Sequence, residues 1–104
     1  MELGRFELEV ISDGTFRLDG GAMFGTIPKP LWEKIAPADD RNRILLGLNI
    51  LLVRTPSENI LIETGLGSYY DEKFAYLYDV DQRTTDLHHG IKAIGLQRAD
   101  IAKV

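Results

Sequence analysis

The sequence predicts an α+β fold in which a mostly antiparallel sheet is followed by two helices. Residues 3–11 alternate between apolar and charged side chains, which is the period of a half-buried strand. Residues 44–54 are apolar nearly throughout, and a polar turn joins them to a second apolar run at residues 60–62. From Ser68 onward the apolar residues recur at three- and four-residue steps, which is the period of a helix.

Composition excludes several classes of protein. A chain of 104 residues is one domain or a piece of one. The net charge of −4 and the scattered basic residues argue against nucleic-acid binding. The absence of cysteine excludes disulfides, thiol nucleophiles and cysteine-type zinc sites. The start of the chain lacks the pattern of a signal peptide, and its longest apolar run is too short to span a membrane, so we expect a cytoplasmic protein.

The first third of the chain contains two glycine-bearing segments. Asp13-Gly14 predicts a hairpin turn between the first strand and a second short one. Residues 19–25 predict a glycine-rich loop that carries Met23 and Phe24. Large apolar side chains on such a loop indicate either the wall of a substrate pocket or packing back onto the core, and the local pattern leaves both open.

The middle of the chain predicts a short helix and the main strand. Two prolines precede residues 31–36, and Pro37 ends the helix predicted there. The sole tryptophan, Trp32, is expected in the core rather than in a pocket. The strand at residues 44–54 is expected to be covered on both faces, because it is apolar nearly throughout.

The last third predicts two helices and the start of a strand. Ser68 is expected to cap the first helix, and the second is expected from about Thr85 to Gly95. A new strand is expected near Ile101. Because domains seldom finish on an apolar strand that is just starting, residues 1–104 are predicted to be the front part of a larger domain. The apolar stripe of the second helix consists of Leu87, Ile91 and Ile94.

The segment NILIETGLG, residues 59–67, is the strongest candidate for a functional site. A short apolar strand there delivers Glu63, Thr64 and Gly65 into a turn, and chemistry in mixed α/β folds tends to lie on loops at strand ends. The alternative is a strand-to-helix turn without chemistry. Nucleotide binding is set aside, because the segment lacks a third glycine and a phosphate-binding lysine.

Four segments carry a resemblance to a known family. They are FRLDGGAMFGTIPKPLWEK (16–34), NRILLGLNILLVRT (42–55), NILIETGLG (59–67) and LHHGIKAIGLQRADIAKV (87–104). Together they resemble the N-terminal part of a metallo-β-lactamase-fold, metal-dependent hydrolase of the lactonase-like kind. The resemblance implies a four-layer αββα sandwich with zinc or another divalent metal pair in the complete domain. It also implies hydrolysis of a lactone, an ester or a related bond by a metal-activated water.

The resemblance assigns roles to particular residues. Glu63-Thr64-Gly65 matches the family's first motif, in which an aspartate usually stands where this chain has glutamate. That carboxylate would support the metal-binding loop by hydrogen bonding. Met23 and Phe24 would line the substrate pocket.

The family's metal-binding His-x-His-x-Asp-His motif does not occur in residues 1–104. The two histidines, His88 and His89, are adjacent on a predicted helix and point about 100° apart, so they are expected to be surface residues rather than ligands. This segment alone is therefore predicted to bind no metal and to be inactive, with no catalytic residue of its own.

Two functions of different classes follow. The first is the N-terminal portion of a hydrolase that acts on a small-molecule substrate once its C-terminal half is present. The second is a stand-alone, non-catalytic binding domain that self-associates. In the first case the isolated segment is expected to expose an apolar sheet face, which would promote dimerisation, element swapping or docking of the missing half. No nucleic-acid or membrane partner is expected.

Overall fold

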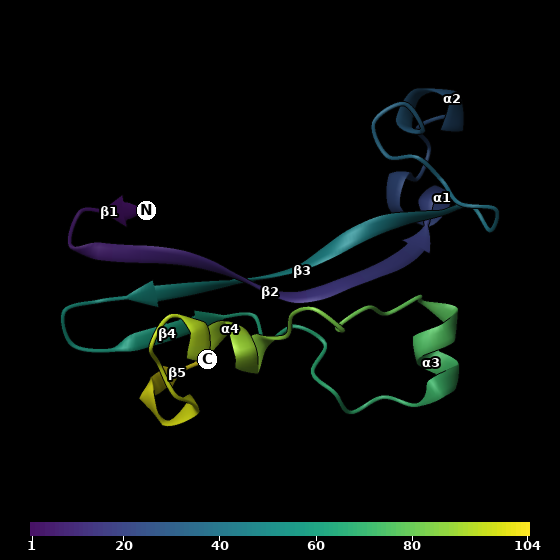
Figure 1. Ribbon diagram of the computed structural model, residues 1–104. Coiled ribbons are helices and arrows are strands. Elements are labelled where there is room, and N and C mark those ends of the chain that lie inside the picture. The colour runs from purple at the N-terminus through teal and green to yellow at the C-terminus, as the bar shows by residue number, and fades with distance from the viewer.

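The computed structural model describes all 104 residues and contains one five-stranded sheet (Figure 1). The strands lie side by side in chain order, and all neighbours are antiparallel except the last pair, which is parallel. The predicted α+β class and the antiparallel first half are confirmed, as is the strand near Ile101. The strands are β1 (Glu2–Leu3), β2 (Phe6–Asp19), β3 (Arg43–Arg54), β4 (Asn59–Ile62) and β5 (Ile101–Lys103).

Four short helices and one 3-10 turn, η1 (Arg98–Asp100), complete the fold. Aspartates cap three of the helices by accepting a hydrogen bond from a backbone N–H in the first turn. None of the helices is long and apolar enough to cross a lipid bilayer. The helices are α1 (Gly20–Phe24), α2 (Lys29–Trp32), α3 (Glu72–Leu77) and α4 (Leu87–Ala93).

The predicted hairpin at Asp13-Gly14 is wrong. These residues lie inside β2, a single strand of 14 residues that pairs with β3 along almost its whole length. The pairing register shifts between Ser12 and Thr15, and Gly14 has a φ of 111°. The glycine therefore makes a β-bulge rather than a turn, because the long partner strand keeps β2 in the sheet on both sides of it.

One face of the sheet packs against α4 and holds the core. The buried cluster contains Ile11, Ile50, Leu52, Leu61 and, from the helix, Ile91. The remaining members of the predicted apolar stripe of α4 pack against the same cluster, so the stripe is confirmed. The helix ends as predicted before a glycine with positive φ.

The opposite face of the sheet is uncovered. Val10 is 71% exposed and Ile62 is 53% exposed, although both are apolar strand residues. The expectation that β3 is covered on both faces is therefore wrong, since Leu45 of that strand is also 56% exposed. We call this surface the open face. The strand register places on it the apolar residues Leu3, Phe6, Leu8, Val10, Leu45, Leu51, Val53, Ile60 and Ile62, with Arg17 opposite Leu45 and Lys103 opposite Ile60.

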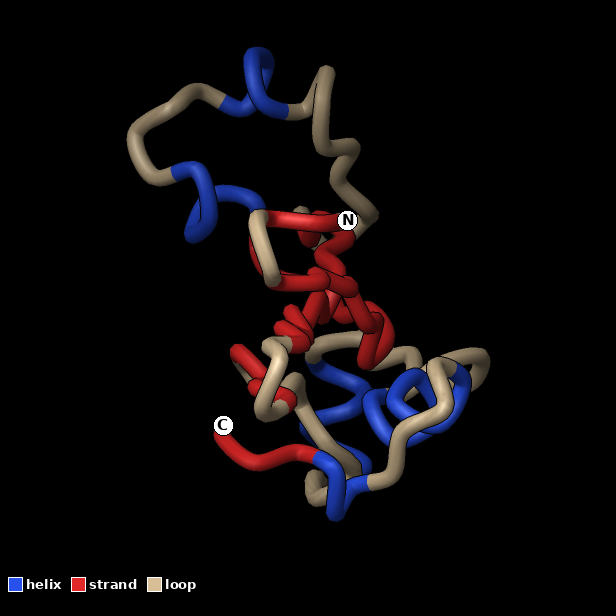
Figure 2. Tube along the Cα trace, turned by 90° about the vertical axis from the view of Figure 1, so that its left-hand side faces the viewer, coloured by secondary structure: helices blue, strands red, loops and turns tan.

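Two predicted helix boundaries differ from the structure. The first C-terminal helix begins at Glu72 rather than near Ser68, because the side chain of Asp71 provides the cap by accepting from the N–H of Phe74, 2.7 Å away. The helix predicted at residues 31–36 spans only Lys29–Trp32. Figures 1 and 2 show α1 and α2 together at one end of the molecule, well apart from α3 and α4.

Candidate functional site

The loop after β4 has a left-handed backbone at three of its residues. Glu63 has a φ of 78°, and Gly65 and Gly67 each have a φ of 69°. A positive φ suits glycine but costs a residue with a side chain on the order of 1–2 kcal/mol. Non-glycine residues in such a conformation are concentrated at functional sites, and Glu63 is one of three in this chain, with Asn42 and Asp79.

The carboxylate of Glu63 serves the backbone of its own loop. It accepts a hydrogen bond from the N–H of Thr64 at 2.9 Å, and both side chains are exposed. The carboxylate thus stabilises the local turn. Its role in supporting a metal-binding loop stays a prediction.

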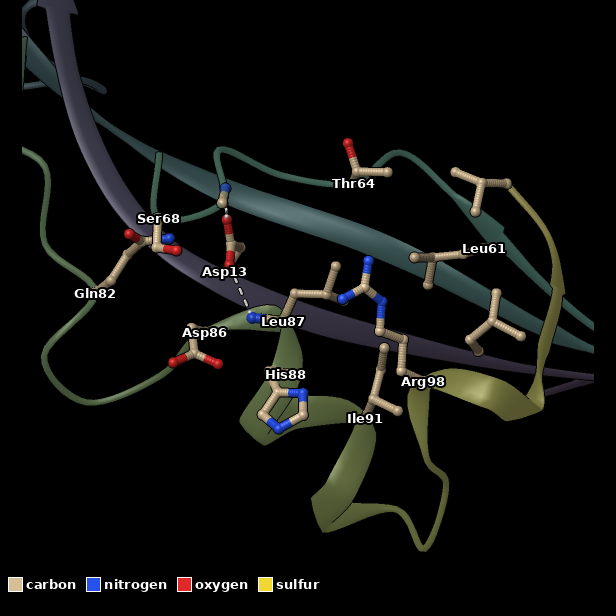
Figure 3. Close-up of a pocket in the computed structure, with 13 residues that line it drawn as sticks. Asp13, Leu61, Thr64, Ser68, Gln82, Asp86, Leu87, His88, Ile91 and Arg98 are labelled. Atoms are coloured by element: carbon tan, nitrogen blue, oxygen red, sulfur yellow. Dashed lines mark hydrogen bonds between the residues drawn. The ribbon is translucent and has the colours of Figure 1, made fainter. Parts of the chain in front are cut away.

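Asp13 is the residue that ties this loop to the rest of the fold. Its side chain is almost fully buried, with a residue exposure of 1%. One carboxylate oxygen accepts from the N–H of Leu66 at 2.7 Å and of Gly67 at 3.1 Å. The other accepts from the N–H of Leu87 at 2.8 Å, at the start of α4 (Figure 3). One carboxylate therefore joins the bulge of β2, the loop after β4 and the first turn of α4.

Glycine at position 65 is required by this arrangement. A Cβ atom there would lie 2.7 Å from Cβ and Cγ of Asp13 and closer still to its Oδ2. The same atom at Gly67 would meet nothing within 4 Å. Gly65 thus lets the loop approach the buried carboxylate, whereas at position 67 glycine is favoured by the positive φ and not by a close contact of its Cα.

The sequence predicted a hairpin turn at Asp13 and did not indicate this role. The available signal was an acidic residue followed by glycine within an otherwise strand-like stretch, which is also the pattern of a bulge. The sequence could not decide between a turn and a bulge, because the three N–H groups that donate to Asp13 lie 53 to 74 residues away.

A cleft of about 720 Å³ lies beside this junction, between the loop after β4 and α4 (Figure 3). Of the predicted site residues, only Thr64 lines it. Asp13 and Asp86 also line it, but both already accept hydrogen bonds from the backbone. His88 and Arg98 contribute the remaining charged or titratable side chains. The cleft can therefore hold a polar ligand, and its two carboxylates also accept hydrogen bonds from the backbone of the loop and of α4.

The two histidines lie on the surface of α4, as predicted. Their ring centroids are 6.2 Å apart with the planes nearly perpendicular. The Nδ1 atom of His89 lies 2.6 Å from a carboxylate oxygen of Asp86, and the side chain is 76% exposed. Hydrogen bonds from the backbone N–H and then the ring of His89 lower the pKa of Asp86 below its ordinary value.

A metal pair does not fit the residues of this chain. No three histidine, aspartate or glutamate side chains gather in a way that could hold a metal ion. The carboxylate of Asp13, although well positioned, faces backbone N–H donors and not other ligands. A metal would need ligands from outside residues 1–104.

Met23 and Phe24 lie far from this cleft. They belong to α1, which forms in place of the predicted loop because Asp19 caps it. The ring of Phe24 stacks on Trp32, with centroids 5.1 Å apart, and Trp32 is buried as expected. Met23 is 47% exposed. Neither Met23 nor Phe24 lines the cleft, whereas Thr64 does. The role of Met23 and Phe24 as the wall of a substrate pocket stays a prediction.

Comparison with known proteins finds similarity to a solved structure. No family model and no curated protein matches the sequence. Among solved structures, a probable metal-dependent hydrolase from Staphylococcus aureus is similar, with a TM-score of 0.90 and 33% sequence identity. The similarity covers 97% of this chain but only 36% of the hydrolase chain. Nearly the whole of this chain therefore has the fold of about one third of that probable metal-dependent hydrolase.

Proposed function

We propose that this chain is the N-terminal portion of a metal-dependent hydrolase that cleaves a lactone or a related ester. The observation that carries the proposal is the similarity to the S. aureus protein, because 33% identity over 97% of the chain is accompanied by a nearly unchanged fold. The metallo-β-lactamase αββα sandwich is part of the proposal. It is supported by the resemblance of residues 16–34 and 59–67 to that family.

This portion would supply structure around the site rather than its metal ligands. The loop after β4, held by Asp13, would present Thr64 to the cleft. Glu63 would support the neighbouring metal-binding loop supplied by the rest of the domain. The zinc or other divalent pair would be bound by that remaining part, since the residues here do not fit it.

A chimera tests the proposal. This chain would replace the matched 36% of the S. aureus hydrolase, and the product would be assayed for bound metal and for hydrolysis of lactones, esters and phosphoesters. We expect metal binding and lactone or ester hydrolysis by the chimera, and neither by residues 1–104 alone. A folded chimera that binds no metal and hydrolyses none of the substrates would contradict the proposal.

A control variant tests the role of Glu63. In the chimera, Glu63→Ala is expected to lower metal occupancy at limiting metal concentration, and Glu63→Asp is expected to preserve it. Equal metal occupancy in all three proteins would remove Glu63 from the site while leaving the hydrolase assignment intact.

The second candidate is a self-associating, non-catalytic binding domain. The open face favours it, because exposed contiguous apolar surface marks an interaction site. A chimera without activity, together with a stable homodimer of this chain alone, would favour this alternative.

A further inference from the structure

The side chain of Gln82 has one hydrogen-bonding end engaged and the other free. Gln82 lines the cleft and is half-buried. Its Oε1 atom accepts a hydrogen bond from the hydroxyl of Tyr70 at 2.6 Å. Its Nε2 atom, which carries two N–H donors, has no partner within the chain and is not fully buried. Because the amide oxygen is engaged, this side chain offers donors rather than an acceptor to a ligand in the cleft.

The bulge of β2 fixes the backbone that carries this side chain. Thr15 and Asp81 exchange two backbone hydrogen bonds of 2.9 Å and so form an antiparallel bridge. A Cβ atom at Gly14 would lie 2.8 Å from Cγ of Gln82 and closer still to the carbonyl oxygen of Asp81. Glycine is therefore needed at position 14 for residues 81 and 82 to approach the strand. The bulge on one side and Tyr70 on the other restrict where the amide of Gln82 can lie.

The charges in the cleft favour an uncharged ligand at Gln82. Arg98 is the one arginine or lysine that lines the cleft, and it lies at the opposite end from Gln82 (Figure 3). The carboxylates of Asp13 and Asp86 lie between the two in this view. An anion bound to Gln82 would be repelled by these carboxylates, and the repulsion is stronger in a partly desolvated cleft than in water. A lactone or ester has a carbonyl oxygen that accepts a hydrogen bond without carrying a charge.

We propose that Gln82, oriented by Tyr70, donates a hydrogen bond to the carbonyl oxygen of an uncharged lactone or ester in the cleft. The inference rests on the proposed function and adds a residue that selects neutral substrates over their acid products. The hydrocarbon part of the ligand contacts Leu61, Leu87 and Ile91, which line the same cleft. Tyr70 does not line the cleft and acts through Gln82 as a positioning residue.

Ligand binding by residues 1–104 tests the inference without catalysis. The probes are δ-valerolactone and δ-hydroxyvalerate, its hydrolysis product, which share a carbon skeleton but differ in charge. Each is titrated near neutral pH while the side-chain amide resonances of Gln82 are followed by NMR, with Gln82→Met providing the assignment. We expect a saturable shift with the lactone and none with the hydroxy acid. Equal shifts with both probes, or no shift with the lactone, would overturn the proposal.

Variants test whether Tyr70 acts through Gln82. Lactone affinity is measured from the backbone amide shifts of Ser68 and Leu87, which line the cleft. Gln82→Met removes the donors and is expected to raise Kd about two- to tenfold, the range for one net hydrogen bond. Tyr70→Phe is expected to raise Kd in the wild-type background and to add nothing to Gln82→Met. Equal effects in both backgrounds would show that Tyr70 does not act through Gln82.

Tyr69→Phe is the matched control for the loss of a tyrosine hydroxyl. Tyr69 is adjacent in sequence and fully exposed, so its substitution is expected to leave lactone affinity unchanged. Far-UV circular dichroism and urea unfolding check that each variant is folded before binding is compared. A loss of affinity in Tyr69→Phe as large as in Tyr70→Phe would contradict a specific role for the Tyr70–Gln82 hydrogen bond.

The chimera separates this inference from the hydrolase assignment. In an active chimera, Gln82→Met is expected to raise KM for the lactone about two- to tenfold with kcat little changed. An active chimera whose KM is the same with Gln82→Met would overturn the role of Gln82 and leave the hydrolase assignment intact. A folded chimera that hydrolyses nothing, while residues 1–104 still bind the lactone through Gln82, would contradict the hydrolase assignment and support the binding site.

Discussion

Substitution of two neighbouring glycines isolates the contribution of the buried Asp13 junction. Gly65 and Gly67 have the same φ of 69°, so alanine at either position pays a similar cost of about 1–2 kcal/mol for a left-handed backbone. Only Gly65 packs against another side chain, where a Cβ would lie 2.7 Å from Cβ and Cγ of Asp13. Gly65→Ala must therefore also displace the carboxylate from at least one charge-assisted hydrogen bond, at about 1.5–3 kcal/mol. We expect Gly65→Ala to lower the free energy of unfolding by about 2.5–5 kcal/mol in total.

The assay is urea unfolding of both variants and the parent, followed by circular dichroism at one protein concentration. A common concentration is needed because any association through the open face would shift apparent stability. Amide exchange at Leu66 provides a local readout, since its N–H donates to Asp13 at 2.7 Å. If Gly65→Ala and Gly67→Ala agree within about 0.5 kcal/mol, the close approach to Asp13 contributes no stability and the reasoning fails.

Three further predictions concern other parts of the fold. Asp13→Ala leaves three backbone N–H groups without their acceptor and is expected to lower the free energy of unfolding by about 3–5 kcal/mol. Amide exchange at Leu87 is expected to become faster, and unchanged exchange there would contradict the role of Asp13 in joining α4 to the loop. Asp86→Ala removes the cap of α4 and is expected to cost about 1 kcal/mol in urea unfolding. Because hydrogen bonds from His89 lower the pKa of Asp86, this contribution is present above the ordinary value of 3.8 and is lost as pH falls through the lowered pKa; exchange in α4 measured against pH checks the direction. Trp32→Ala is expected to lower the free energy of unfolding by about 3–5 kcal/mol and to speed amide exchange in α1 and α2 while β3 stays protected. Loss of protection throughout the chain would show that the packing of Trp32 and Phe24 is not separate from the core.

Elements formed from local patterns were predictable from the sequence. The strand at residues 44–54 and the turn into β4 follow from a long apolar run interrupted by proline and polar residues. The apolar stripe of α4 follows from helical spacing, and its end follows from Gly95. These signals come from residues within a few positions of one another, so they do not depend on how the rest of the chain packs.

Errors arose where a local pattern has two structural outcomes. Asp13-Gly14 suits a hairpin turn and a bulge equally well, and the long pairing partner β3 selects the bulge. Ser68 is an acceptable cap, yet α3 begins after Asp71, whose carboxylate accepts from the helix backbone. The glycine-rich stretch at residues 19–25 becomes α1 because Asp19 caps it and Trp32 packs beside it.

The sequence by itself determined the α+β class, the main strands and the second C-terminal helix, and it predicted a candidate site in the Glu63–Gly67 segment. Only the tertiary structure decided that Asp13 holds this segment, that Gly65 is needed for its approach, and that one apolar face of the sheet is open. The physical reason is that strand and helix propensities depend on neighbouring residues, whereas burial and hydrogen bonding to Asp13 depend on donors 53 to 74 positions away. Alternation in residues 3–11 likewise showed that β2 has an apolar side, but only the packing of α4 decided which side is covered.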